Sequence, residues 1–541
     1  MQRLITIVLI LIIGFSAQAQ QTIQRPKLVV GIVIDQMRWD YLYRYYDRYA
    51  SNGGFKRMLN KGFTCENTQI PYTPTYTGCG HSSIYTGSVP ALNGITGNYW
   101  WDREQMRSVY CTEDKTVNTV GSNSTAGKQS PRNMLTTTIC DELRIATNFK
   151  SKVVGISIKD RGGILPAGHS ANAAYWYDNT TGDWITSTYY INELPKWVNN
   201  FNKQKLVDKY YQQGWSLMYP SATYLQSTAD EKSHEAKTLG GNTFPYDSLY
   251  KYIGKDYGKI STTPMGNTMT AEFAKAALVA EQLGADNITD FLAVSFSSPD
   301  YIGHSYGPNS MEAEDGFLRL DKELGSLLDF LDSKVGKGQY TLFLSADHGV
   351  ANTPEYMKEN KMPGGRIFMN DVTKQMNKLL NEKYKIGNIV VYDDNYQIGL
   401  NHPAIDSAKV NTEEITDWIV SYLSKDSAIA RVFPLEELNE VPLPAAVRNM
   451  LNNGYYKKRS GDIQFILKPN YIDAWSNTGT THGLWNPYDS HIPLLWYGWG
   501  IKQGKTNRET YMTDIAPTIA AMLRIQVPNG SIGHVITEVI K

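Results

Sequence analysis

Three carboxylates and three imidazoles in this sequence have the residue types and the spacing of metal ligands. One pair forms Asp-x-x-x-His within Ser-Pro-Asp-Tyr-Ile-Gly-His, and another is the adjacent Asp-His of Ser-Ala-Asp-His-Gly. Oxygen and nitrogen donors without sulfur suit zinc in a catalytic centre, where substrate needs an open position. Six ligands are the right number for two metal ions. The candidates are Asp35, Asp300, His304, Asp347, His348 and His482.

Each of these residues alone has an ordinary structural explanation. An Asp at the end of a strand is usually a turn former or a helix cap, and a lone His is more often packed or solvated than bound to metal. The combination is less ordinary, because nearly all six follow predicted strands or lie in turns that contain Gly. The combination therefore favours a metal centre.

A hydroxyl nucleophile for such a centre can come from the segment Pro74-Thr75-Tyr76-Thr77-Gly78-Cys79-Gly80-His81. The segment leads into residues that can start a helix, and a helix start offers backbone N–H groups to an anion. A free Thr hydroxyl is a poor nucleophile at neutral pH, but zinc coordination favours its alkoxide. Without the metal motifs, the segment would read as a Ser/Thr-rich loop with an ordinary helix cap.

Near-continuous apolar runs predict the strands that must position these residues. Helical patterns lie between the runs, for example at Thr270 to Leu283 and at Glu312 to Leu331, and this alternation predicts a largely parallel α/β sheet. Open α/β sheets bind ligands beyond the carboxyl ends of their strands, where distant residues converge. The predicted strands are Lys27 to Ile34, Ser151 to Ile158, Thr289 to Phe296, Tyr340 to Ser345, Ile389 to Tyr392 and Ile492 to Tyr497.

Two stretches interrupt the alternation. Residues 175–266 are rich in Tyr, Trp, Asn and Ser, and residues 374–470 are mixed in composition, as in a smaller sub-domain. We expect both to be insertions on a single catalytic domain that spans residues 20–541.

The first residues resemble an export signal. Arg3 precedes the apolar run Leu4 to Phe15 and the Ala-x-Ala site that ends at Ala19. The run is too short to span a bilayer as a mature helix, and Gln20 stands where a lipoprotein would have Cys. We expect residues 1–19 to be removed after Ala19, which leaves a periplasmic protein without a stable membrane anchor.

The charge composition does not favour nucleic acid or an anionic membrane as a partner. The chain has 53 Lys plus Arg and 53 Asp plus Glu, so its net charge gives no argument for nucleic acid or for an anionic membrane.

Export permits disulfides, but the pairing of the four cysteines stays open, and the absence of Cys-x-x-Cys argues against a thiolate zinc site. The cysteines are Cys65, Cys79, Cys111 and Cys140.

The order of these motifs resembles that of the alkaline phosphatase superfamily. The Pro-Thr-x-Thr-x-x-Gly-His element is similar to the nucleophile loop of its nucleotide pyrophosphatase/phosphodiesterase branch and of its phosphate-insensitive, PafA-type monoesterases. The closing stretch Thr513 to Thr518, with Pro528-Asn529-Gly530 after it, is also similar. The likeness runs from about Lys27 to about His534 and is weakest in the two insertions.

The resemblance implies a three-layer αβα sandwich with inserted sub-domains, a monomer, and two zinc ions per chain. Thr77 would be the nucleophile and would become phosphorylated during turnover, and Asn98 would donate a hydrogen bond to a phosphate oxygen. One zinc would be held by Asp300, His304 and His482, and the other by Asp35, Asp347 and His348 together with the Thr77 oxygen.

Lys159 and Arg161 resemble the cationic pair of the PafA-type enzymes. A phosphate monoester carries one more charge than a diester, and phosphoryl transfer spreads that charge over three oxygens. Two cations facing this group favour monoesters, with Arg supplying a planar fork and Lys a point charge. The implied activity is that of an alkaline phosphatase acting on small-molecule phosphate monoesters. The alternative for Lys159 and Arg161, a solvated Lys-Asp-Arg turn, is less favoured because a predicted strand ends just before them.

The same residues allow comparison with four other functions. A phosphodiesterase of the superfamily would keep the metals and Thr77, whereas a non-catalytic periplasmic binding protein should have lost some ligands. Sulfatases need Cys-x-Pro-x-Arg, and the sequence from Cys79 to Ser83 lacks it. The phosphoglycerate mutases use manganese in the cytoplasm, which conflicts with the export signal.

Overall fold

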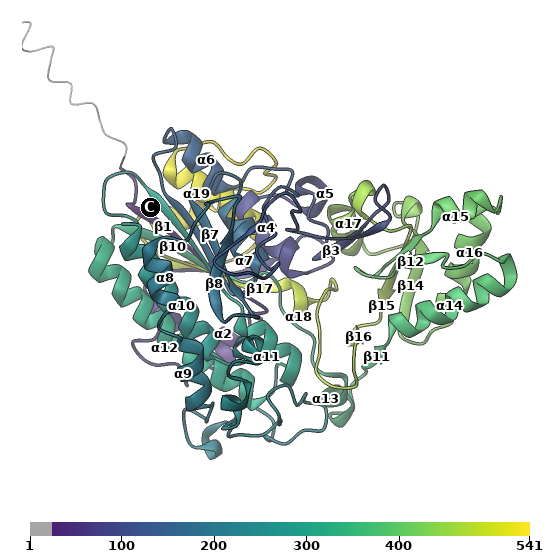
Figure 1. Cartoon of the computed structure of the whole chain (residues 1–541), viewed down its shortest axis with the longest axis horizontal. Coiled ribbons are helices and arrows are strands. Elements are labelled where there is room, and N and C mark those ends of the chain that lie inside the picture. Colours follow the sequence, from purple (N-terminus) through teal and green to yellow (C-terminus); the bar gives the residue numbers. More distant parts are fainter. Residues whose placement is uncertain (1–23) are drawn as a thin grey trace, which may run out of the picture.

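A ten-stranded mixed sheet forms the centre of the computed structural model, which describes residues 24–541 (Figure 1). The predicted signal peptide, residues 1–19, lies outside the described residues. Among the helices that are described, none is long and apolar enough to cross a membrane. In spatial order the strands are β18 (Gly504–Tyr511), β2 (Phe63–Gln69), β17 (His491–Gly498), β10 (Tyr340–Ser345), β1 (Leu28–Ile34), β9 (Asp290–Phe296), β6 (Val153–Ser157), β7 (Ala173–Asp178), β8 (Asp183–Ser187) and β5 (Thr119–Val120).

The middle of this sheet is parallel. Strand β1 pairs in parallel with β10 and β9, β6 pairs in parallel with β9 and β7, and every residue of β1 is buried. The apolar runs of these strands therefore have helices or loops on both faces, as expected for a parallel sheet. Five of the predicted strands correspond to β1, β6, β9, β10 and the antiparallel β17, with ends that differ by two residues at most.

Helices cover both faces of the sheet and complete the three-layer arrangement (Figure 1). The predicted helices at 270–283 and 312–331 correspond to α10 and α12. One layer contains α4 (Thr77–Thr86), α6 (Ile139–Ala146), α7 (Asp160–Ala167) and α19 (Ile515–Leu523). The other contains α3 (Gly54–Lys61), α8 (Lys196–Asn202), α9 (Leu206–Gln213), α10 (Met265–Ala280), α11 (Ser298–Tyr306) and α12 (Met311–Leu331).

The stretch 175–266 begins inside the central sheet, because strands β7 and β8 extend that sheet. The rest of the stretch contains α8, α9 and short 3₁₀ helices. It packs beside α12, where Trp215 donates its indole N–H to Asp315 over 2.8 Å. Trp184 stacks on Phe273 of α10 with ring centroids 4.2 Å apart. Many of its aromatic residues therefore cover a helical layer.

The stretch 374–470 builds a lobe at one end of the molecule (Figure 1). Its four-stranded sheet has its own buried core, which includes Met376, Ile398, Ile419 and Phe465. The predicted strand at 389–392 belongs to this sheet and not to the central one. The lobe contains α14 (Met369–Tyr384), β12 (Val390–Tyr392), β13 (Gln397–Leu400), α15 (His402–Ser407), α16 (Thr412–Leu423), β14 (Ile429–Pro434), α17 (Ala445–Gly454) and β15 (Ile463–Leu467).

All four cysteines are buried as free thiols. Burial raises the pKa of Cys79 beyond its ordinary range, which keeps this thiol protonated and unreactive. Cys79 lies only two residues after Thr77, so the difference matters for the choice of nucleophile.

Candidate active site

A cavity of about 610 Å³ brings together residues that follow several strands of the central sheet. Lys159 comes after β6 and Asp300 after β9, as expected for ligand sites of open α/β sheets. Asp35, Asp347 and His348 follow β1 and β10 and are fully buried. The lining includes Thr77, Asn98, Lys159, Arg161, Asp300, His304 and His482.

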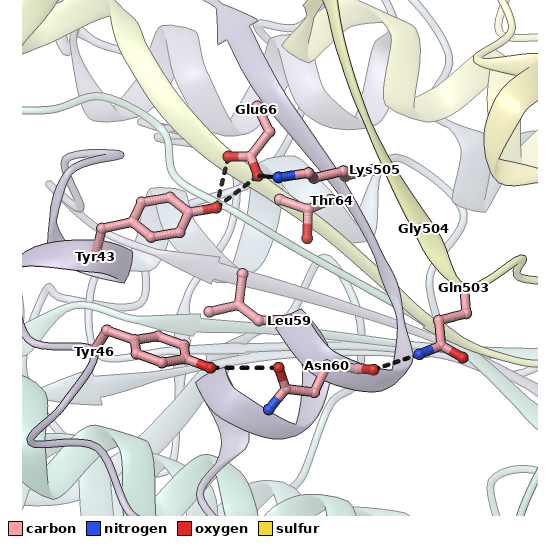
Figure 2. A pocket seen from close by; sticks show the side chains of 9 residues that line it. All are labelled: Tyr43, Tyr46, Leu59, Asn60, Thr64, Glu66, Gln503, Gly504 and Lys505. Atoms are coloured by element: carbon pink, nitrogen blue, oxygen red, sulfur yellow. Dashed lines mark hydrogen bonds and ion pairs between the residues drawn. The ribbon is translucent and has the colours of Figure 1, made fainter.

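A second cavity, of about 420 Å³, lies near the edge strand β18 and its neighbour β2 (Figure 2). Its polar side chains pair with one another: the Tyr43 hydroxyl donates to the Glu66 carboxylate over 2.6 Å, and Lys505 lies 4.0 Å from Glu66. None of the predicted site residues lines this cavity. Because the predicted site residues line the cavity of about 610 Å³ and not this one, the larger of the two is the candidate site.

The first ligand group consists of Asp300, His304 and His482. One donor atom from each residue lies within 4.8 Å of the other two. The Asp300 Oδ1 atom lies 3.1 Å from His304 Nε2 and 3.7 Å from His482 Nε2. Donors on a tetrahedral zinc with bonds of 2.0–2.1 Å lie about 3.3 Å apart. The geometry therefore fits such an ion.

The second group surrounds His348. Its Nε2 atom lies 3.4 Å from each of three oxygens: Asp35 Oδ1, Asp347 Oδ2 and Thr77 Oγ1. These spacings also match the donor separations around a small tetrahedral cation. A second compact triad joins Asp35, Asp300 and His348, so Asp300 is close to both groups.

Each of the three histidines is held through its other ring nitrogen. The Nδ1 atoms lie 2.8, 2.7 and 2.9 Å from the backbone carbonyl oxygens of Thr480, Thr75 and Gly349, for His304, His482 and His348 in turn. Donation from Nδ1–H to a carbonyl leaves the Nε2 lone pair to accept a metal ion. Burial lowers the pKa of His348 and of His482, which favours their neutral, ligating form.

The carboxylates of Asp35 and Asp347 each have a buried oxygen that could bind a cation. Asp35 Oδ1 and Asp347 Oδ2 are buried and accept no hydrogen bond. Burial, together with the nearby carboxylates of Asp300 and Asp347, raises the pKa of Asp35 well above its usual range. The His81 Nδ1 atom lies 3.3 Å from Asp347 Oδ2. A buried carboxylate oxygen that accepts no hydrogen bond is costly, so these two oxygens favour a cation nearby.

The Lys159 ammonium supplies part of that charge. Its Nζ atom lies 2.6 Å from Asp35 Oδ2 and 2.5 Å from Asp300 Oδ2. Burial opposes the charged form, but these two carboxylates raise the pKa of Lys159 above its ordinary value. The ammonium occupies the position of a cation between the two ligand groups, which shows that this space suits positive charge.

Thr77 is the first residue of α4, and its side chain is buried beside His348. Two glycines in the same segment allow this approach. A Cβ atom at Gly80 would lie 2.4 Å from the Asp347 carbonyl oxygen, and Gly78 donates its N–H to Asn98 over 2.9 Å. Because the Asn98 Oδ1 atom accepts that bond, its side-chain NH₂ group is left to donate to a ligand in the cavity.

The Arg161 guanidinium is held in position by a hydrogen bond to Tyr110. It donates to the Tyr110 hydroxyl over 2.9 Å, and that hydroxyl donates to Asp160. Its buried Nε–H has no partner. Arg161 also lines the cavity, so its guanidinium is the cationic group that this wall offers to an anion.

Gln36 is a site residue that sequence reasoning missed. Its side-chain amide donates to Asp300 Oδ1 over 2.7 Å, and its backbone N–H donates to Asp347 Oδ1 over 3.1 Å. The residue is buried and has φ of +66°, a conformation that is rare for a residue other than Gly. It touches one carboxylate from each ligand group, and its only sequence signal is its place directly after Asp35.

The comparisons with known proteins agree with this geometry. The sequence profile of the family "Type I phosphodiesterase / nucleotide pyrophosphatase" matches residues 29–486. The chain is 53% identical to the alkaline phosphatase PhoV of Synechococcus elongatus, over 96% of this chain and 94% of that protein. It is 50% identical to the alkaline phosphatase PafA of Elizabethkingia meningoseptica, over 97% and 96% of the two chains. The crystal structure of wild-type PafA superposes with a TM-score of 0.94 at 49% identity, covering 96% of this chain and all of that one.

Proposed function

The chain belongs to the type I phosphodiesterase/nucleotide pyrophosphatase family, within the alkaline phosphatase superfamily, and we propose that it hydrolyses phosphate monoesters with two zinc ions and with Thr77 as nucleophile. Its full-length likeness to PhoV and PafA makes it an alkaline phosphatase, and small phosphate monoesters are the substrates of that class. The observation that carries the finer proposal is the position of Thr77 Oγ1, 3.4 Å from His348 Nε2 and within the second ligand group.

The donor set fits zinc. Asp300, His304 and His482 would hold one ion, and Asp35, Asp347 and His348 the other. When bound, zinc supplies Lewis-acid stabilisation of the charge that develops on the attacking and leaving oxygens. The donors contain no sulfur, and each His is oriented through Nδ1, as in catalytic zinc sites of other proteins.

The protein's own groups then perform the transfer. Thr77 Oγ1 attacks phosphorus in line, the alcohol departs, and water hydrolyses the resulting phosphothreonine with release of inorganic phosphate. Burial of Thr77 at the start of α4 limits its rotamers and excludes bulk water from the nucleophile. The Asn98 amide and the Arg161 guanidinium would donate to the non-bridging oxygens, and such pre-positioned donors strengthen phosphoryl transfer.

Two cations in the cavity favour a monoester over a diester. Bound metal ions would replace the Lys159 ammonium as the counter-charge of Asp35 and Asp300, and Lys159 would then pair with the substrate. Together with Arg161 it would face the additional charge of the monoester. A phosphodiesterase is the second candidate, because the name of the matching family contains that activity.

We also place the enzyme in the periplasm as a monomer, with residues 1–19 removed. N-terminal sequencing of the exported protein should begin at Gln20. A sequence that begins at Met1 would contradict the export proposal, but it would leave the proposed hydrolysis by Thr77 unaffected.

The test compares a phosphate monoester with the methyl diester of the same alcohol, using protein whose zinc content is measured. We expect two zinc ions per active chain and a much larger kcat/KM for the monoester. Full activity in magnesium alone would refute the zinc proposal. A larger kcat/KM for the diester would favour the phosphodiesterase instead.

A further inference from the structure

The catalytic cavity contains two aromatic side chains that the chemistry above does not use. Trp475 is 74% exposed and Tyr99 is 48% exposed, yet both line this cavity. A large aromatic residue that remains so exposed loses most of the free energy available from burial. Tyr76 and Tyr301 also line the cavity but are half-buried, so Trp475 and Tyr99 are its two most exposed aromatic side chains.

Trp475 is held in place by its loop. Arg366 forms an ion pair with Glu355 at 2.6 Å and donates to the carbonyl oxygens of Ser476 and Gly479. Gly479 has φ of +73°, and a Cβ atom there would lie 2.1 Å from the His304 carbonyl oxygen. The loop that carries Trp475 therefore packs directly against α11.

The position of Trp475 relative to the ligands identifies the part of a substrate that it would meet. Its ring centroid lies 6.0 Å from that of His304, which belongs to the ligand group opposite the one near Thr77. In an in-line displacement the attacking and leaving oxygens lie on opposite sides of phosphorus. With Thr77 attacking from its own group, the alcohol leaves toward His304 and hence toward Trp475.

Tyr99 adds a second ring to the same cavity. It directly follows Asn98, the predicted phosphate donor, and its ring packs against Tyr110 with centroids 4.9 Å apart. The cavity volume of about 610 Å³ is far more than a phosphoryl group needs and lies in the range of sites for drug-sized ligands. The cavity therefore has room for a ring-containing alcohol.

We propose that Trp475 and Tyr99 form a leaving-group subsite for phosphate monoesters whose alcohol carries a flat aromatic ring, a class that includes nucleoside monophosphates. This inference rests on the proposed monoesterase function. Aromatic rings stack on flat π-systems with little loss of conformational entropy, and a sugar or an alkyl alcohol offers no such face. The subsite would thus raise kcat/KM for aromatic substrates above that for aliphatic ones.

The experiment uses adenosine 5′-monophosphate and ribose 5-phosphate, which share the reacting ester and differ in the base. The zinc-loaded wild type should show a higher kcat/KM for the nucleotide. Trp475→Ala should lower the ratio of the two values by about fivefold to tenfold, the effect of one lost stacking contact. Trp475→Phe should keep most of the ratio, whereas Trp475→Leu, which keeps apolar bulk without a ring, should lose it. Tyr99→Ala should lower the ratio in the same direction.

Tyr250→Ala removes an aromatic residue that is 54% exposed outside the cavity and is the matched control. It should leave both rates unchanged, and every variant should retain the zinc content of the wild type. A Trp475→Ala variant with an unchanged ratio, or with equal losses on both substrates, would overturn the subsite. A zinc-loaded wild type that hydrolyses neither substrate would instead refute the monoesterase proposal.

Discussion

Lys159 can serve either the metal ligands or the substrate. Its ammonium is close to two candidate metal ligands, and the residue also lines the cavity. In the described structure it balances the charge of Asp35 and Asp300. In a metal-bound enzyme those carboxylates would have another partner, and the ammonium would be free to pair with substrate. Arg161 differs, since Tyr110 fixes it at the wall of the cavity.

Substitution of either cation tests the preference for monoesters. Lys159→Ala and Arg161→Ala should each lower kcat/KM for a monoester by roughly 100-fold, the usual effect of losing one pre-positioned donor to the transition state. The loss on a matched diester should be at least about tenfold smaller, because the diester carries one charge fewer. Steady-state kinetics on both substrates, with zinc content measured, provide the check. Equal losses on the two would mean that these residues support only the fold or the metal centre.

Gln36 provides a second prediction at this scale. Removal of its amide from Asp300 should weaken zinc binding about 10- to 100-fold, as loss of a ligand's hydrogen-bond partner does elsewhere. Gln36→Gly is the sharpest variant, because Gly accepts a φ of +66° without strain while the side chain that donates to Asp300 is removed. Titration of the apoprotein against a chromogenic chelator measures the effect independently of activity. Wild-type affinity in this variant would show that Gln36 does not position Asp300.

The candidate ligand residues could be selected from the sequence because carboxylates and imidazoles at strand ends have few other common functions in such numbers, and the structure brings them together. Gln36 could not, because its contribution depends on a left-handed backbone and on Gly303, a residue distant in sequence. A Cβ atom at Gly303 would lie 1.8 Å from the Gln36 amide oxygen. The fit of the Gln36 side chain against Gly303 depends on the folded structure and leaves no pattern in the sequence.

At the scale of secondary structure, the apolar strands β1, β6, β9, β10 and β17 were predictable, whereas β2, β7, β8 and the edge strand β18 were not. The runs of β1, β9 and β10 are apolar because both faces are covered. Strand β18 has the sequence Gly-Lys-Thr-Asn-Arg-Glu-Thr-Tyr, and most of its residues are exposed at the edge of the sheet. Charged residues protect such edges from pairing with other chains, and they also remove the apolar signal by which a strand is recognised.

Helix α12 carries a buried acid near its first turn. Burial raises the pKa of Glu312 to about 8, even though the hydrogen bond from the Tyr246 hydroxyl lowers it. Between the ordinary glutamate pKa and about pH 8, the folded chain keeps a proton that the unfolded chain releases. The free energy of unfolding therefore falls as pH rises through this window.

Glu312→Gln should remove this pH dependence while its amide oxygen still accepts from Tyr246. Relative to wild type, the variant should gain stability at pH 9 compared with pH 5, on the order of 2 kcal/mol. Urea unfolding at the two pH values measures the difference. Glu436→Gln, at an exposed position, is the control and should behave alike at both. A Glu312→Gln variant with the same pH dependence as wild type would contradict the buried, protonated state.

For the whole molecule, the metal centre joins segments from nearly the full length of the chain, from Asp35 to His482. Removal of bound zinc should therefore destabilise the protein globally and not only inactivate it. Free zinc at 1,000 times its dissociation constant stabilises the native state by about 4 kcal/mol per site. A chelator should lower the unfolding temperature measured by calorimetry, and added zinc should restore it. An unchanged unfolding temperature after verified metal loss would contradict a centre that holds these segments together.

The central claim is that the phosphoryl group passes through Thr77. The most direct measurement is an acid quench of the zinc-loaded enzyme during turnover of a labelled phosphate monoester, followed by peptide mass spectrometry. The label should appear on the peptide that contains Thr77, at the same position in Thr77→Ser, and nowhere in Thr77→Ala. Label on another residue, or an unlabelled enzyme that converts a chiral phosphate monoester with inversion at phosphorus, would contradict the account.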